Sequence, residues 1–232
     1  MKLVAMMLTH NDENRFLRPV LERLTSYVDE TVILDDSDDN SAEIAKSYKN
    51  TIVHKIEPSP FLIRGENVVR RQLYDLTIGR NPDWILAICS DYIFQKKFEE
   101  QVRSMLETDY RWFQFAVCDM WNETHYLKPP FINGGTKYLF RFEEDKLRWF
   151  TNMKLHCGDV PVYLFNDPNG LKTDILVKHL GLLRKEDRLR RIAINEGFGN
   201  TPGNSAWLKV AEQYRVLDEN PQDLATLGEW EE

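Results

Sequence analysis

Cysteine is scarce in this sequence, and its arrangement excludes two kinds of stabilising site. Cys89, Cys118 and Cys157 are odd in number and far apart, which fits reduced, buried thiols better than a disulfide framework. No two of them have the CxxC spacing of a zinc site. The 232 residues must therefore be held together by a hydrophobic core, and a chain of this length can bury one.

Long apolar runs and an excess of positive charge are also lacking. The apolar run at residues 3–8 is too short for the hydrophobic region of a signal peptide or for a membrane-spanning helix. With 30 Lys and Arg against 37 Asp and Glu, the net charge is −7. A phosphate backbone repels such a chain, so nucleic acid is not expected as a main partner. We predict a cytoplasmic protein without a transmembrane segment.

The sequence does contain an alternation of strand and helix patterns. Four apolar or β-branched runs typical of buried strands lie at 3–8, 31–34, 52–56 and from Trp84 onward. Between them, apolar residues at helical spacing predict helices at 13–27, 42–48 and 66–78. This order predicts an α/β fold with a Rossmann-like, mostly parallel central sheet that is flanked by helices.

The pattern changes after Asp91. A helix is predicted at 96–107, and longer strand-like runs follow at 111–122, 136–142 and 174–177. These runs favour a smaller mixed or antiparallel extension of the sheet. The segments 185–197 and 205–217 predict a helical C-terminus.

Polar residues follow three of the predicted parallel strands, at 9–12, 35–39 and 90–91. The carboxyl ends of parallel strands lie along one edge of a sheet, and ligands bind there. We therefore expect these three segments to converge.

Two residues at predicted strand ends are candidate metal ligands. An unpaired buried carboxylate is costly, so Asp91 either caps the following loop or binds a divalent ion that bridges phosphates. His179 follows a later apolar run, and it is either a structural histidine or a metal ligand. The residues alone leave both alternatives open.

Charged clusters suggest where an anionic or polar ligand binds. The turn DDSDDNS has four aspartates within five residues, and their repulsion indicates that some accept hydrogen bonds, from the turn itself or from a ribose or base. Arg64, Arg70 and Arg71 lie near the start of the helix predicted at 66. They are either solvated or paired with a diphosphate.

Three stretches in this order, LTHNDENRFL, VILDDSDDNSAEIA and ENVVRRQLYDLTIGRNPDWILAICSDYIF, resemble the inverting glycosyltransferases of family 2, which have the GT-A fold. The match covers about the first 100 residues, and KLHCGDVP and VKHLGLLRKEDRLRR resemble C-terminal segments of bacterial members. The resemblance implies a nucleotide-sugar-binding half at 1–100, an acceptor-binding half at 101–182 and a helical C-terminal segment at 183–232.

The resemblance also assigns roles to individual residues. It places Thr9 and Asn11 against the nucleotide, Asp35 as an acceptor from the base and Asp39 beside it. It makes Arg71, with Arg64 or Arg70, face the diphosphate.

The family's Asp-x-Asp signature falls on residues 89–91. Its final aspartate is Asp91, which with His179 would hold Mn²⁺ or Mg²⁺. The chain has Cys89 in place of the first aspartate and Ser90 at the middle position, beside the nucleotide. One carboxylate of the signature is therefore missing.

The implied reaction moves a sugar from a nucleotide-diphosphate donor to an acceptor hydroxyl with inversion, which requires a general base. Asp159 is the first candidate base, followed by Asp119 and His156. A UDP-sugar is the favoured donor, with GDP or dTDP as alternatives, and the acceptor is a glycan, a protein or a small molecule.

Two other functions remain open from the sequence. One is a nucleotidyltransferase, although LTHNDEN has no glycine-rich phosphate loop. The other is a catalytically weak or inactive nucleotide- or carbohydrate-binding protein of the same fold, which the incomplete signature allows. The oligomeric state is unknown.

Overall fold

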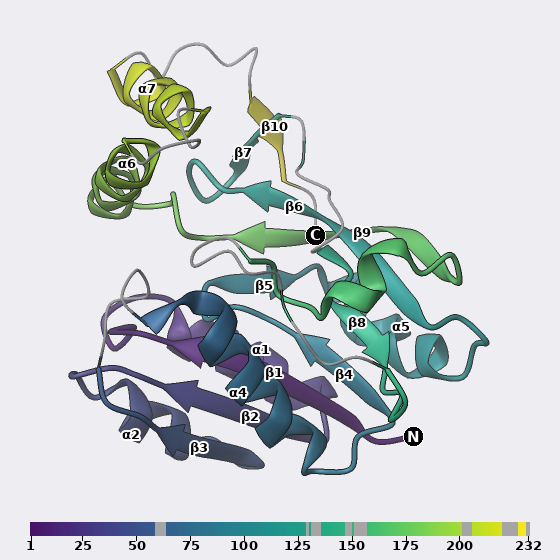
Figure 1. Cartoon of the computed structure of the whole chain (residues 1–232). Helices are drawn as coiled ribbons and strands as arrows, with labels where there is room; N and C mark the ends of the chain where they lie inside the picture. The colour runs from purple at the N-terminus through teal and green to yellow at the C-terminus, as the bar shows by residue number, and fades with distance from the viewer. Residues whose placement is uncertain are drawn as a thin grey trace. The chain divides into compact units, whose positions relative to one another are not determined.

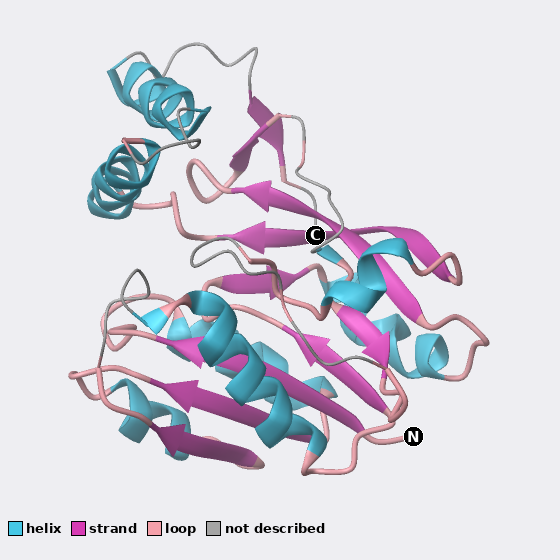
Figure 2. Cartoon of the chain, in the orientation of Figure 1, coloured by secondary structure: helices cyan, strands magenta, loops and turns pink. Residues whose placement is uncertain are grey.

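A sheet with the strand order β3-β2-β1-β4-β8-β6-β9-β5 organises the chain (Figure 1). The computed structural model describes residues 1–58, 64–128, 130, 136–146, 150, 157–200, 206–219 and 227–230. Figure 2 shows helices and strands alternating through the first half of the chain. The predicted α/β fold class is confirmed.

The parallel part of the sheet consists of β1 (Leu3–Thr9), β2 (Glu30–Asp35), β3 (Thr51–Lys55) and β4 (Trp84–Ala87). β1 pairs in parallel with both β2 and β4, and β2 pairs in parallel with β3. β1, β2 and β4 are almost entirely buried, as expected for central strands that are covered on both faces. Their near-continuous apolar sequences follow from this double coverage.

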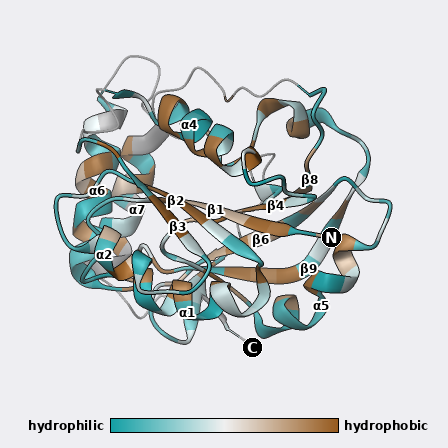
Figure 3. Cartoon of the chain, turned by 90° about the horizontal axis from the view of Figure 1, so that it is seen from below, coloured by the Kyte–Doolittle hydropathy of each residue, from teal (hydrophilic) through white to brown (hydrophobic). Residues whose placement is uncertain are grey.

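Helices cover both faces of this parallel part. α4 (Glu66–Ile78) lies on one face, against β1 and β2, whereas α1 (Leu17–Tyr27) and α5 (Lys96–Leu106) lie on the other (Figures 1 and 3). A shorter helix, α2 (Ser41–Lys46), packs against β3. Hydrophobic residues run along the central strands in Figure 3, because the helices turn their apolar faces toward the sheet.

The extension of the sheet contains antiparallel pairs, as predicted. It consists of β5 (Tyr92–Phe94), β6 (Trp112–Asp119), β8 (Leu139–Arg141) and β9 (Gly170–His179). β8 pairs antiparallel with both β4 and β6. A short 3₁₀ helix, η2 (Val162–Asn166), precedes β9.

The chain divides into two compact units. The first contains residues 1–116 and 132–177, and the second contains residues 117–131 and 178–232. The second unit has α6 (Lys185–Gly199), α7 (Ala206–Glu219) and the antiparallel pair β7 (His125–Leu127) and β10 (Leu227–Glu229). Its small core consists of Trp121, Leu127 and Leu182, with Tyr214 packed against them. The functional division predicted at residues 100 and 182 stays a prediction.

Some elements differ from the sequence prediction, and β9 begins at Gly170 rather than near residue 174. α1 begins at Leu17 rather than near residue 13, because Asn11 has a positive φ of 54° and the Arg15 N–H donates to the Asp12 carbonyl at 3.0 Å. These two features form a turn before the helix. The pair β7 and β10 was not predicted, since its partners lie far apart in the sequence. No helix in the described part of the chain is both long and apolar enough to cross a membrane.

Candidate functional site

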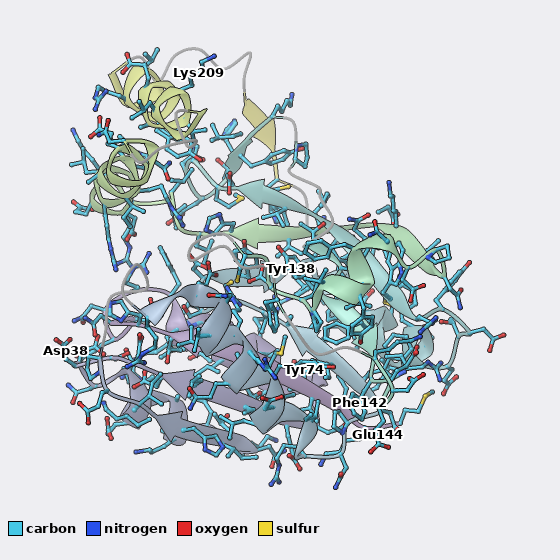
Figure 4. All side chains as sticks on the ribbon, in the orientation of Figure 1. Asp38, Tyr74, Tyr138, Phe142, Glu144 and Lys209 are labelled. Atoms are coloured by element: carbon cyan, nitrogen blue, oxygen red, sulfur yellow. The ribbon has the colours of Figure 1, made fainter. Side chains whose placement is uncertain are left out.

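The three polar segments at the strand ends converge, as the sequence predicts. The Thr9 hydroxyl donates to Asp35 Oδ1 at 2.6 Å, which joins the ends of β1 and β2. The Ser90 hydroxyl donates to Asp12 Oδ2 at 2.6 Å, which joins the segment after β4 to the one after β1. Figure 4 labels Asp38, which lies at this edge of the sheet.

Asp35 is an interior anchor of the acidic turn. It is 0% exposed, and Oδ1 accepts from the hydroxyls of Thr9 and Ser37 at 2.6 and 2.7 Å. The Lys55 ammonium lies 3.6 Å from Oδ2. The donors anticipated for the turn are thus protein groups in this case, and the contact between Asp35 and a base stays a prediction.

Asp39 and Asn11 also hold the turn in shape. Asp39 accepts from the Ser41 N–H and hydroxyl at 2.9 and 2.6 Å and from the Glu13 N–H at 3.1 Å. Burial raises the pKa of Asp39, but these hydrogen bonds outweigh it and leave the pKa below its ordinary value. The Asn11 side-chain oxygen accepts from the Asp38 N–H at 2.9 Å. Both residues therefore fix the shape of the edge where the parallel strands end.

Asp36 is a candidate site residue that was not predicted from the sequence, which pointed to its neighbour Asp35 instead. Its side chain is only 5% exposed, and Oδ1 lies 2.9 Å from His10 Nδ1. The other oxygen, Oδ2, is buried and has no hydrogen-bond partner. Such an atom calls for a missing donor, because buried carboxylate oxygens in proteins are nearly always bonded. The signal that could have identified Asp36 is its place directly after the end of β2.

Arg64 has a buried hydrogen-bond donor without an acceptor. Its Nη2 donates to the Glu57 carbonyl at 2.6 Å, whereas Nη1 is buried without a partner. Of the other predicted arginines, Arg71 is exposed on α4 and Arg70 points into the protein.

Asp12 connects the predicted nucleotide and metal residues. It is buried and accepts from Ser90 and, at 2.9 Å, from Arg15. Burial raises the pKa of Asp12, and the Asp91 carboxylate adds to the rise, while the bonds from Ser90 and Arg15 oppose it. Asp91 is thus near enough to act electrostatically on this group.

A buried charged cluster surrounds Arg70. Its Nη2 lies 2.6 Å from Asp159 Oδ1 and 3.0 Å from Glu66 Oε1. The Cys89 thiol donates to the same Asp159 oxygen at 3.4 Å. Burial raises the pKa of Asp159, the nearby Glu66 and Asp91 carboxylates raise it further, and Arg70 only partly opposes them. Burial also raises the pKa of Cys89 well above its ordinary value, so this thiol stays protonated.

The second unit brings two predicted residues together. His179 Nδ1 lies 2.5 Å from Asp119 Oδ1, between the ends of β9 and β6. A carboxylate can only accept, so Nδ1 carries the proton, and Nε2 is the nitrogen that would bind a metal. His156 lies outside the described residues. Asp91 belongs to the first unit and His179 to the second, and their joint role as metal ligands stays a prediction.

The described residues contain no group of three or more His, Cys, Asp or Glu side chains that could hold a metal ion. Mg²⁺ is often held by one or two carboxylates together with substrate phosphates and water. Asp91 fits this kind of site, since its charge adds to those of Asp12 and Asp159. The Asp119 bond gives His179 the carboxylate partner that metal-binding histidines commonly have.

No protein-family model matches the chain, and no curated protein matches it. Mannosyl-3-phosphoglycerate synthase from Rubrobacter xylanophilus is 18% identical with a TM-score of 0.40, over 51% of this chain and 41% of that one. Glucosyl-3-phosphoglycerate synthase from Mycobacterium tuberculosis is 18% identical with a TM-score of 0.39, over 50% and 44%.

A third solved structure covers more of both chains. The 4-diphosphocytidyl-2C-methyl-D-erythritol synthase from Anaerococcus prevotii is 10% identical with a TM-score of 0.43, over 80% of this chain and 92% of that one. This chain spans less than half the length of the two sugar-phosphoglycerate synthases.

Proposed function

We propose that this chain binds a nucleotide-sugar at the edge where β1, β2 and β4 end and transfers the sugar to an acceptor hydroxyl with inversion. The observation that carries the proposal is a pair of unmatched atoms, Asp36 Oδ2 and Arg64 Nη1. The first is a buried acceptor without a donor, and the second is a buried donor without an acceptor. A nucleoside diphosphate supplies what both lack, namely a base N–H and phosphate oxygens.

The positions of these atoms distinguish them from the unmatched atoms of three strand residues in the first unit. Asp36 directly follows β2, and Arg64 lies in the segment that follows β3. Thr31, Thr51 and Trp84, whose side chains also have unmatched atoms, lie at or near the opposite ends of their strands. Ligands of parallel sheets bind at the carboxyl ends. The unmatched atoms of Asp36 and Arg64 thus lie in the segments where a ligand is expected.

The leaving diphosphate gains negative charge as its bond to the sugar breaks. Arg64 would stabilise that charge through its guanidinium group. A bound Mn²⁺ or Mg²⁺ at Asp91 would supply further positive charge to the phosphate oxygens.

Asp159 is the proposed base that takes the proton of the acceptor hydroxyl. Both of its described contacts, from Arg70 and Cys89, are made to Oδ1, which leaves Oδ2 as the atom to receive a proton. A raised pKa also makes this carboxylate a better base than an ordinary aspartate. Asp119 is the second candidate, because it could act through His179 Nε2 as a histidine–carboxylate pair.

One observation favours a second function, nucleotide-sugar binding without turnover. The ion pair of 2.6 Å between Arg70 and Asp159 also stabilises the charged carboxylate, which weakens a base. Cys89 occupies the place of a carboxylate in the family signature. Slow or absent transfer with intact binding would fit this alternative.

Titration calorimetry with UDP and UDP-glucose, with and without Mn²⁺, tests the binding step. Asp36→Asn should weaken UDP binding by about tenfold or more, since it removes a charged acceptor. Asp38→Asn is the matched control, because Asp38 is an exposed residue of the same turn. Arg64→Met should weaken binding similarly, whereas Arg18→Met, at an exposed position of α1, should have little effect. Absence of UDP binding to the unaltered chain, or equal binding by Asp36→Asn, contradicts the proposed site.

Turnover is tested separately by release of UDP from UDP-glucose with water or added sugars as acceptor. Asp159→Asn should abolish this release while leaving UDP binding intact. Binding without release in the unaltered chain would select the second function.

A further inference from the structure

We propose that His10 selects the base of the nucleotide by occupying one oxygen of Asp36, so that the site accepts uracil or thymine and discriminates against guanine. This inference rests on the proposed nucleotide site. It adds a specificity-determining residue and names the class of base.

The backbone holds His10 and Asp36 next to each other. His10 directly follows β1 and Asp36 directly follows β2, two strands that pair in parallel. The Asp36 N–H donates to the Thr9 carbonyl at 3.2 Å, which places the two side chains at the same level of the sheet edge. His10 Nδ1 then meets Asp36 Oδ1 at 2.9 Å.

The roles in this bond follow from the chemistry of the two groups. An ionised carboxylate has no proton to give, so the proton lies on His10 Nδ1 and Asp36 Oδ1 accepts it. The imidazole is 35% exposed and the carboxylate is 5% exposed. His10 is therefore the more accessible member of the pair, and its ring stands beside Oδ1.

Only Oδ2 remains as an unmatched acceptor on Asp36. Uracil and thymine each have a single ring N–H between two carbonyl groups, and one carboxylate oxygen satisfies it. Guanine has a ring N–H next to an amino group, and this pair of donors requires both oxygens of a carboxylate. With Oδ1 bonded to His10, guanine loses its second bond and meets the imidazole ring.

The other two bases present a lone pair where an N–H is needed. The ring nitrogen on the pairing edge of cytosine and of adenine is an acceptor, and an acceptor facing a carboxylate is repelled. At the ring nitrogen of these bases the carboxylate therefore meets a repelling lone pair, and only their amino groups can donate to it. His10 is required only for the distinction between guanine and the two imide pyrimidines.

Two variants separate this role from simple support of the turn. His10→Ala frees Asp36 Oδ1 and opens the space of the ring. His10→Asn keeps an N–H donor close to the position of Nδ1, because the side-chain amide of asparagine resembles that edge of the imidazole. A residue with a purely structural role would affect the binding of every nucleotide alike.

The test is titration calorimetry of the unaltered chain and both variants with UDP, dTDP, GDP and CDP in the presence of Mn²⁺. We expect UDP and dTDP to bind the unaltered chain at least about tenfold more tightly than GDP, which corresponds to one lost hydrogen bond to a charged group. In His10→Ala this ratio should fall toward one, because GDP gains affinity while UDP does not. In His10→Asn the preference should persist.

Three results overturn the proposal. They are binding of GDP to the unaltered chain as tight as that of UDP, weakening of all four nucleotides by the same factor in His10→Ala, and unchanged UDP binding in Asp36→Asn. The first result needs no variant, so the proposal stays falsifiable even if His10→Ala does not fold. If no nucleotide binds the unaltered chain, the proposed function fails as well. If UDP binds with no role for His10, only the selection by His10 fails.

Discussion

Replacement of Arg70 by methionine should destabilise the protein strongly. The Arg70 side chain is 8% exposed, and its partners Glu66 and Asp159 are 12% and 15% exposed. Methionine fills much of the space of the arginine stem but has no charge. Two largely buried carboxylates then lose their common partner, and removal of one member of a buried ion pair costs about 3–5 kcal/mol. This is a large part of a typical free energy of unfolding of about 5–15 kcal/mol.

The loss should depend on pH in a defined direction. Burial already raises the pKa of Asp159, and Arg70 opposes the rise, so the pKa of Asp159 should rise further in Arg70→Met. An acid whose pKa is higher in the folded than in the unfolded state makes the folded state bind more protons between the two pKa values. Stability is then lost as the pH rises through that interval. The deficit of Arg70→Met should therefore be smaller in acid than in alkaline solution.

Urea unfolding followed by circular dichroism at about pH 5 and about pH 8 measures this effect. The matched control is Arg71→Met on the same helix, where the side chain is exposed and the change should stay within about 0.5 kcal/mol. The reasoning is refuted if Arg70→Met loses less than about 1 kcal/mol at about pH 8, or if its deficit is the same at both pH values.

Two further predictions concern stability. In Gly170→Ala the new Cβ would lie 2.0 Å from the Trp112 ring, so urea unfolding should show that the free energy of unfolding falls by about 1–3 kcal/mol or more. Gly197 lies in α6, and a Cβ added there meets nothing within 4 Å. Gly197→Ala should therefore raise the free energy of unfolding by up to about 1 kcal/mol. Equal effects of the two changes would contradict this. Because the pKa of Asp12 is raised mainly by burial, the unaltered chain should lose stability relative to Asp12→Asn as the pH rises from the ordinary aspartate pKa through the raised one. A relative gain over that interval in urea titrations would show that the pKa is lowered instead.

Local sequence patterns determined most of the secondary structure. The apolar run after Lys2 predicts β1, because a strand that is buried on both faces has a nearly continuous apolar sequence. The helical spacing of residues 66–78 predicts α4, because a helix that is buried on one face repeats its apolar residues every three to four positions. The positive φ of Asn11 and the pairing of β7 with β10 were not predicted. A single backbone angle and a pairing between distant segments leave no periodic signal.

The sequence by itself also determined that polar residues follow the parallel strands, and hence that Thr9, Asp35 and Ser90 lie along one edge. Only the tertiary structure decided which of these groups already have partners within the chain. It satisfies Asp35 and leaves Asp36 Oδ2 unmatched, and it pairs Arg70 with Asp159 while leaving Arg71 exposed. The reason is physical: the order of residues places charges at a strand end, but hydrogen bonds are made between atoms from different segments, and their pairing is settled only when those segments pack.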